Sequence, residues 1–177
     1  YRLALACTTE YAAFHVAAAG LGGGTLAQKK AAVLAAMNVT MTRVNGIYER
    51  DMALTMVLIA NNENIINITS DTLDNSNTNN VLLDQNQTFI DATIGSANYD
   101  IGHLFGASGG GGNAGCIGCV CGTASYAGTY LGNGKGSGIT SPANAIPSGD
   151  YFDIDYVVHE IGHQLGGNHS FTHGYEG

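Results

Sequence analysis

The sequence is poor in basic residues and contains no tryptophan. It has 6 Lys and Arg against 14 Asp and Glu in 177 residues, which gives a net charge of −8. This acidic balance argues against nucleic acid and anionic membranes as partners, because both repel a negatively charged surface. Since only 11% of the residues are charged, the surface must consist largely of Asn, Ser, Thr and Gly. Such a surface favours a secreted, extracellular protein.

Long hydrophobic runs are also missing. The longest apolar stretch, ALTMVLIA at residues 53–60, is far shorter than the roughly 20 residues that span a bilayer. We therefore expect no transmembrane helix. The chain starts at Tyr1 without a signal-peptide pattern, so we expect any targeting segment or pro-segment to have been removed or left out.

Cysteine is scarce, with only Cys7, Cys116, Cys119 and Cys121. An even number is compatible with two disulfides in an oxidising compartment. The cluster CIGCVC could instead bind a metal, but the second matched pair of ligands is missing, which disfavours that interpretation. We expect some or all of the cysteines to be oxidised, with Cys116 or Cys121 paired to a distant cysteine.

Hydrophobic periodicity in the first third of the chain predicts alternating strands and helices within one domain. Residues 1–11 are typical of a strand, and the glycines at residues 20–24 break the chain before the next element. Thr25 and Gln28 form a capping-box pattern, and apolar residues then recur every three or four positions as far as Tyr48. This pattern predicts a long amphipathic helix, and the apolar run after it predicts a buried strand.

The middle of the chain continues the alternation. Residues 81–94 favour a second amphipathic helix and residues 99–106 a strand. The glycine-rich region after this strand contains two short apolar pieces, AGCIGCVC at residues 114–121 and GSGIT at residues 136–140, which we interpret as strands. The whole pattern predicts an α/β or α+β domain with a partly parallel sheet.

A polar loop at residues 61–80 ends in DTLDNSNTNN, whose side-chain oxygens are of the kind that calcium prefers. The spacing matches no EF-hand loop. A solvated loop with Asx-turns is the preferred interpretation, and a calcium site is the alternative.

Half of the six histidines lie near the end of the chain, in VVHEIGHQLGGNHSF at residues 157–171. We expect Asp150 to cap a helix through this stretch. On that helix His159 and His163 are four residues apart, so their imidazoles can point at one ion. Glu160 is one step round the helix, where it can reach a water molecule beside the ion.

Gly166 lies where this helix should stop, because glycine enters a left-handed backbone conformation at small cost. The turn can bring His169 back as a third ligand. Three imidazoles leave one position of a tetrahedral Zn²⁺ open for water, which is typical of a catalytic site. Buried histidines with ordinary hydrogen bonds are the alternative, but they would not require Glu160 and Gly166 at these spacings.

The pattern His159-Glu160-x-x-His163-x-x-Gly166-x-x-His169 is the zinc signature of metzincin metallopeptidases. Together with SANYDIGHLFG, FDIDYVVHEIGHQLGGNHSF and the order of the elements, it resembles the upper part of a reprolysin (adamalysin)-like catalytic domain of the secreted bacterial type. The resemblance implies a metzincin-like upper subdomain, with a twisted mixed sheet of about five strands, a long helix and a zinc-binding active-site helix.

The function implied is that of a zinc-dependent endopeptidase acting on protein or peptide substrates. The three histidines would bind Zn²⁺, and Glu160 would be the catalytic base. Two alternatives stay open: a zinc-containing module that binds peptides without cleaving them, and a zinc hydrolase of a non-peptide substrate. Glu160 argues against the first, because a purely structural zinc site needs no carboxylate beside its water.

In that family a methionine-containing turn and a lower subdomain come after the zinc helix. Only residues 170–177 come after His169 here, and every methionine lies upstream. We therefore expect residues 1–177 to be the upper, N-terminal part of the catalytic domain, with the rest in a missing C-terminal segment or a second chain. His173 is interpreted as a loop histidine rather than a competing ligand.

The resemblance also implies a substrate-binding strand. In that family the last strand before the zinc cleft is an open, antiparallel sheet edge, and residues 114–121 match it in order. We expect an extended peptide to pair with the backbone of Ile117, Gly118 and Cys119, where small residues let another chain approach. The alternative is a glycine-rich loop held by disulfides.

Overall fold

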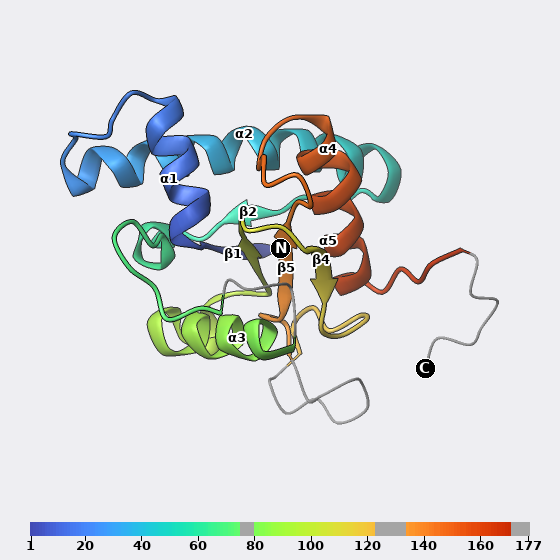
Figure 1. The fold of residues 1–177 in the computed structure, drawn as a ribbon. Coiled ribbons are helices and arrows are strands. Elements are labelled where there is room, and N and C mark those ends of the chain that lie inside the picture. The colour runs from blue at the N-terminus through green and yellow to red at the C-terminus, as the bar shows by residue number, and fades with distance from the viewer. Residues whose placement is uncertain (75–79, 123–133, 171–177) are drawn as a thin grey trace.

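Helices cover both faces of a five-stranded mixed sheet in the computed structural model (Figure 1). The structure describes residues 1–74, 80–122 and 134–170. The strands, in chain order, are β1 (Arg2–Cys7), β2 (Val57–Leu58), β3 (Ile101–Phe105), β4 (Gly111–Ala114) and β5 (Gly138–Ser141). The predicted mixed sheet of about five strands is therefore confirmed.

The strands lie in the order β2-β1-β3-β5-β4. Strand β1 is parallel to both β2 and β3, and β3 is parallel to β5. Strand β4 is antiparallel to β5 and forms one edge of the sheet. All residues of β1 except Arg2 are buried, as expected for a strand covered on both faces.

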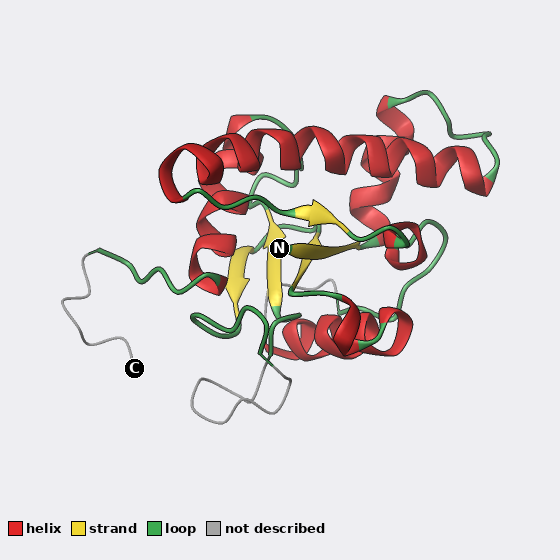
Figure 2. Ribbon diagram, turned by 180° about the vertical axis from the view of Figure 1, so that it is seen from behind, coloured by secondary structure: helices red, strands yellow, loops and turns green. Residues whose placement is uncertain are grey.

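Two helical layers enclose the sheet (Figures 1 and 2). Helix α3 lies on one face, and α1, α2 and the C-terminal helical segments lie on the other. The helices are α1 (Thr9–Ala18), α2 (Leu26–Met52), α3 (Asn80–Ile94), α4 (Asp150–Phe152), η4 (Asp153–Val158, a π-helix) and α5 (His159–Gln164), with short 3₁₀ turns η1 (Asn62–Ile65) and η2 (Ser96–Asn98). None of the described helices has the length and apolar character needed to cross a membrane.

Helix α2 begins with the predicted capping box. The Thr25 hydroxyl accepts a hydrogen bond from the Gln28 amide at 3.3 Å, and the Gln28 side chain accepts one from the Thr25 amide at 2.9 Å. The helix ends at Met52, where Ala53 takes a left-handed conformation with φ of 53°. The capping box thus marked the start of this helix correctly.

Two predictions for the first third of the chain are wrong. The opening strand does not reach residue 11, because Thr8 caps α1 through a hydrogen bond from the Tyr11 amide at 3.4 Å. The buried strand expected at residues 53–60 is only the two-residue β2, and Val57 is 64% exposed. The physical reason is that Ala53 ends α2 in a left-handed conformation, so it belongs to the helix cap and not to a strand. Strand β2 then lies at a sheet edge, where Val57 is exposed.

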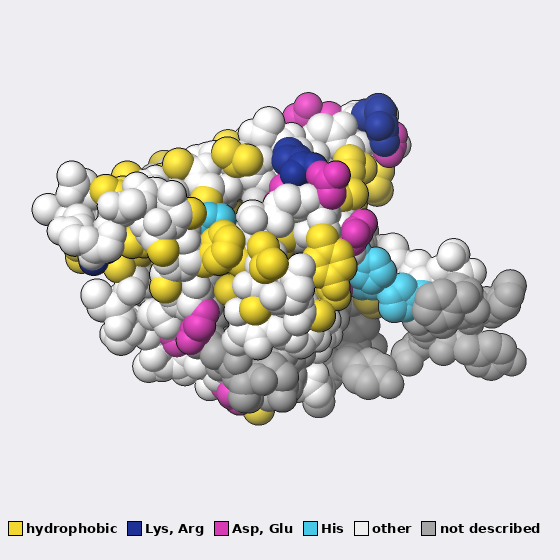
Figure 3. All heavy atoms as spheres, turned by 45° about the horizontal axis from the view of Figure 1, so that its top comes forward, with side chains coloured by type: hydrophobic (Ala, Val, Ile, Leu, Met, Phe, Trp, Pro, Cys, Tyr) yellow, Lys and Arg dark blue, Asp and Glu magenta, His cyan; other side chains and the backbone are white. Residues whose placement is uncertain are grey.

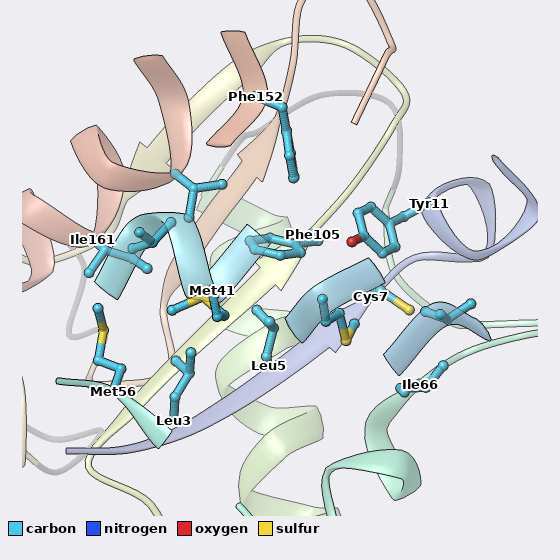
Figure 4. Close-up of a cluster of buried hydrophobic side chains, with 14 of the residues drawn as sticks. Leu3, Leu5, Cys7, Tyr11, Met41, Met56, Ile66, Phe105, Phe152 and Ile161 are labelled. Atoms are coloured by element: carbon cyan, nitrogen blue, oxygen red, sulfur yellow. The ribbon is translucent and has the colours of Figure 1, made fainter. Parts of the chain in front are cut away.

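Strand β1 divides the core into two hydrophobic clusters. Leu3, Leu5 and Cys7 point towards α2, whereas Ala4 and Ala6 point towards α3. This alternation results from the two-residue period of a strand. We call the cluster on the α2 side the upper cluster, and part of it is drawn in Figure 4.

The upper cluster also anchors the histidine-bearing helix. Ile161 of α5 and Phe152 of α4 are completely buried against Phe105 and residues of α2 (Figure 4). Fully burying a side chain of this size stabilises the fold by roughly 1.5–3 kcal/mol. Core packing therefore sets which face of α5 is turned away from the sheet.

The start of this helical region differs from the prediction. Gly149, with φ of 82°, leads into α4, and Asp150 is the first helical residue rather than its cap. The Asp150 carboxylate forms an ion pair with Arg43 of α2, and Asp153 pairs with the same guanidinium at 2.7 Å. Because Arg43 attracts both carboxylates, neither is used to cap the helix.

Candidate metal centre

Three histidine side chains converge at the C-terminal end of α5. The Nε2 atoms of His159 and His163 are 3.0 Å apart, those of His163 and His169 are 3.1 Å apart, and those of His169 and His159 are 3.2 Å apart. Figure 3 shows histidine side chains grouped at the surface. The geometry brings together all three residues that the sequence predicts as metal ligands.

A hydrogen bond fixes the tautomer of His163, and burial acts on the pKa of His159. His163 Nδ1 lies 2.6 Å from the Gly167 carbonyl oxygen, which can only accept, so Nδ1 carries the hydrogen and Nε2 keeps its lone pair. Burial, followed by the neighbouring imidazoles His163 and His169, lowers the pKa of His159. A ligand nitrogen must be unprotonated, so both effects suit metal binding.

The triangle of Nε2 atoms fits a single ion. Nitrogens about 3 Å apart can all lie at the ligand distance of roughly 2.0–2.1 Å that zinc takes with histidine. In the described part of the chain, this is the only group of three His, Cys, Asp or Glu side chains close enough to share an ion. His173 lies outside the described residues.

A calcium site in the polar loop, the alternative to a solvated loop, gains no support from the described residues. One Asp71 carboxylate oxygen accepts a hydrogen bond from the Thr9 amide at 2.7 Å, and the other accepts one from the Leu73 amide at 3.2 Å. The second bond is an Asx-turn, as the solvated-loop interpretation expects. Residues 75–79 of this stretch lie outside the described part of the chain.

Gly166 makes the turn that leads from α5 to His169. Its φ of 108° lies in the left-handed region that favours glycine. The Gly166 amide donates to the His163 carbonyl at 2.9 Å, and the Gly167 amide donates to the Gly162 carbonyl at 2.8 Å. The turn lies where the sequence places it, and the third histidine comes three residues later.

Glu160 lies between α5 and the edge strand β4. Its side chain is only 6% exposed, and burial raises the pKa of its carboxyl group to about 7. A Cβ atom added to Gly112 would lie 2.3 Å from both Cγ and Oε1 of Glu160, so only glycine fits there. Because Gly112 has no side chain, the Glu160 carboxylate can occupy this position.

A cavity of about 230 Å³ opens between α5 and β4. The residues that line it come from the two elements and the turns after them: Gly112, Asn113, Ala114, Ile117, His159, Glu160, His163 and His169. A second hollow of about 520 Å³ reaches the same histidines from the C-terminal end of α2. Among the described residues, the group of histidines is thus open on two sides.

The strand predicted at residues 114–121 is wrong in its position. Strand β4 occupies Gly111–Ala114, and the chain turns over residues 115–121. Gly118 and Cys121 have φ values of 74° and 64°, which no extended strand contains. An antiparallel edge strand does lie beside the histidines in the described sheet, but it begins three residues earlier.

The three residues predicted to bind substrate have different surroundings. Ile117 lines the cavity, but the Gly118 amide donates to the His163 carbonyl at 3.1 Å, and Cys119 is buried. An incoming peptide could therefore not use the Gly118 N–H, which is already bonded. Of these three residues, only Ile117 lines the cavity where a substrate would lie.

The cysteines pair locally rather than over a long distance. Cys116 and Cys119 form a disulfide across the turn at Gly118, with their Cα atoms 5.8 Å apart. Cys7 is a buried free thiol in the upper cluster, and Cys121 is an exposed one. The predicted pairing of Cys116 or Cys121 with a distant cysteine is wrong, because the positive φ at Gly118 brings near neighbours together.

Two residues beside the site, Gly112 and Gln164, are not marked by any pattern in the sequence. Gly112 is one of 26 glycines, and nothing in its neighbourhood marks it as the one that faces Glu160. Gln164 lies inside the signature at a position where the pattern allows any residue. Its side chain is buried between α5 and the sheet and bonds His103, a contact that only the structure reveals.

Residues 34–170 match the sequence model of a family described as metallo-peptidase family M12B, reprolysin-like. The match covers most of the chain, including the three histidines and Glu160. No curated protein matches the chain significantly.

Proposed function

The chain belongs to the reprolysin-like metallopeptidase family M12B, and on this premise we propose that it is a zinc-dependent endopeptidase. One observation carries the proposal: three imidazole Nε2 atoms converge within 3.0–3.2 Å beside a buried carboxylate. A site that only stabilised the fold would have no use for that carboxylate. A zinc ligand set of three histidines leaves a position for water and substrate.

His159, His163 and His169 would hold the ion through their Nε2 atoms. A bound zinc would supply Lewis-acid chemistry, polarising the scissile carbonyl and lowering the pKa of a water molecule towards about 7. The histidines then act as ligands and do not themselves transfer protons.

Glu160 would move the proton. Its carboxylate accepts a proton from the attacking water as the water oxygen bonds to the carbonyl carbon, and it returns that proton to the leaving amine as the C–N bond breaks. Its burial supports this role, because a carboxyl group with a pKa raised to about 7 can both accept and release a proton near neutral pH.

The edge of β4 would hold the substrate as an added strand. The Gly115 amide donates to the Ser137 carbonyl at 2.7 Å, and in an antiparallel ladder the bonded positions alternate. The backbone N–H and C=O groups of Gly112 and Ala114 therefore point to the edge that no other described strand pairs with. We propose that an extended peptide pairs with these two residues, and that Ile117 contacts one of its side chains.

We also propose that the protein is secreted. The Cys116–Cys119 disulfide supports this, since disulfides persist in oxidising compartments. Detection of four free thiols in protein taken from its natural compartment would contradict the proposal.

Metal analysis combined with turnover tests the function. We expect one zinc per chain, and hydrolysis of a generic protein substrate that a chelator abolishes and added zinc restores. His163→Gln should lose the zinc. His15→Gln is the matched control, because His15 lies on α1 and bonds the Pro147 carbonyl at 3.1 Å, away from the centre.

Three outcomes would contradict the proposal. Zinc binding without cleavage of any protein substrate would favour a peptide-binding module, and cleavage of a non-peptide substrate alone would favour a different hydrolase. Full zinc content in His163→Gln would show that the ion lies elsewhere.

A further inference from the structure

Gln164, the last residue of α5, connects the metal-binding helix to the sheet. It comes directly after the ligand His163 and is completely buried. Its side-chain nitrogen donates to the carbonyls of Gly102 and Lys135 at 2.9 and 3.4 Å. Its side-chain oxygen lies 2.7 Å from Nδ1 of His103. One amide thus joins α5 to β3 and to the segment leading into β5.

His103 is the partner that fixes this amide. It is 0% exposed at the centre of β3, and its Nε2 atom lies 2.9 Å from the Thr140 hydroxyl of β5. Because the Gln164 nitrogen bonds two carbonyls, its oxygen must face His103, so Nδ1 carries the imidazole hydrogen. Nε2 therefore accepts from Thr140. The donors run in one direction, from Thr140 to His103 to Gln164.

The sheet is shaped to admit the amide. A Cβ atom added to Gly138 of β5 would lie 2.2 Å from the Gln164 side-chain oxygen. The strand therefore has a glycine where the Gln164 side chain crosses it. A buried amide with every partner in place has one favourable position, because any shift leaves polar groups unpaired.

We propose that Gln164 and His103 are positioning residues of the metal centre, which hold the end of α5 so that its histidines converge. Helix α5 has only six residues, and its other end continues into the π-helix η4. The turn to His169 starts two residues after Gln164. A displacement of this end of α5 would therefore move His163 and His169 relative to His159.

This inference rests on the proposed function to the extent that the ion is zinc. Neither residue touches the cavity or the ligand nitrogens, so both act through the helix backbone. Outer partners that orient metal ligands commonly change metal affinity by roughly 10–100-fold when removed. An effect on affinity is what separates a positioning role from a contribution to stability alone.

The experiment measures zinc affinity in folded, full-length protein. Gln164→Leu and His103→Leu should each raise the zinc dissociation constant roughly tenfold, measured by competition with a chromogenic chelator. The double variant should be no weaker than the weaker single variant, because both break the same link. The visible absorption spectrum of the Co²⁺-loaded protein should change in each, since it reports ligand geometry.

A conservative variant should rescue the site. In His103→Asn the side-chain amide can place an N–H near the position of Nδ1, so we expect a dissociation constant within about threefold of the wild type, well below the loss expected of an outer partner. Asn62→Leu is the control for lost stability. Asn62 is buried and bonds the amide and carbonyl of Leu5, and neither of these hydrogen-bond partners lies on α5.

Each outcome decides the proposal. If Gln164→Leu and His103→Leu only lower the melting temperature, as Asn62→Leu should, with unchanged zinc affinity and cobalt spectrum, the positioning role is wrong. If neither leucine variant folds, Thr140→Val decides instead: a raised dissociation constant supports the proposal, and an unchanged one overturns it. A wild-type protein that binds no zinc would overturn the proposed function together with this inference.

Discussion

Helix α5 forms one wall of the cavity beside the histidines, and the edge strand β4 forms the other. On α5 the side chains of His159, Glu160 and His163 reach the cavity. On β4 the lining residues are Gly112, Asn113 and Ala114, and the first and last of these offer little besides backbone. In the proposed mechanism, the reactive groups and the substrate-holding groups therefore come from separate elements. A change on one wall should therefore alter a different property from a change on the other.

The two walls are also held in different ways. Helix α5 has Ile161 in the upper cluster and Gln164 bonded to the sheet. Among the strands that the structure describes, β4 is bonded only to β5, and it leads into the turn that the Cys116–Cys119 disulfide closes. We expect the helix wall to depend on long-range packing and the strand wall on local constraints.

The largest expected effect comes from the reactive group of the helix wall. Glu160→Gln keeps the shape of the side chain but cannot accept a proton, so turnover should fall by roughly 10²–10⁴-fold. Zinc content and melting temperature should stay close to the wild-type values. Asp155→Asn, an exposed carboxylate on the same helical segment, is the matched control. Wild-type turnover in Glu160→Gln would show that another group is the base.

The buried His103, which bonds Gln164 of α5, should make the free energy of unfolding depend on pH. Burial lowers the pKa of His103 to about 4, and uncharged Gln164, Thr140 and Phe105 surround it. Below about pH 6.5 the unfolded chain binds a proton at this residue, whereas the folded protein does not until about pH 4. The free energy of unfolding should therefore fall by about 3 kcal/mol across this window.

Urea unfolding in the presence of a chelator measures this effect without interference from zinc binding. His103→Asn has no group that titrates there, so its stability should decline less between pH 7 and pH 4 than that of the wild type. Equal declines in the two proteins would mean that His103 is protonated in the folded state.

On the strand wall, Gly112→Ala tests whether backbone shape matters to the reaction. The new Cβ would overlap the Glu160 side chain, so β4 or the carboxylate must shift, and a shift of about 1 Å can lower turnover roughly 10²-fold. Zinc affinity should stay near that of the wild type. Gly23→Ala is the control, because nothing lies within 4 Å of a Cβ there. Unimpaired turnover in Gly112→Ala would contradict the close approach of the two walls.

The smallest expected effect concerns the turn after β4. Replacing both Cys116 and Cys119 by serine should lower the free energy of unfolding by up to about 2 kcal/mol, since the disulfide closes a very short loop. Because Ile117 lies within that loop, KM should rise while kcat and zinc affinity hold. Cys121→Ser, at an exposed free thiol, is the control. A loss of zinc in the double variant would show that the walls are not separable.

The cluster of three histidines could be predicted from the sequence because it depends on side chains at fixed local spacings. His159 and His163 are one helical turn apart, so helix geometry alone aligns them. Gly166 allows the turn to His169, and Thr25 with Gln28 marks the start of α2 in the same local way. The predicted methionine turn and lower subdomain stay predictions.

Only the tertiary structure decided how this local site is completed. Gly112 faces Glu160 because β4 packs beside α5, and 61 positions separate His103 from the Gln164 that it orients. The turn that joins Cys116 to Cys119 replaced the expected strand because of the positive φ at Gly118. Local hydrogen bonding and helix periodicity depend on residues that are close together in the sequence. Which backbones meet across the sheet depends on the packing of the whole core, and no short stretch of sequence specifies it.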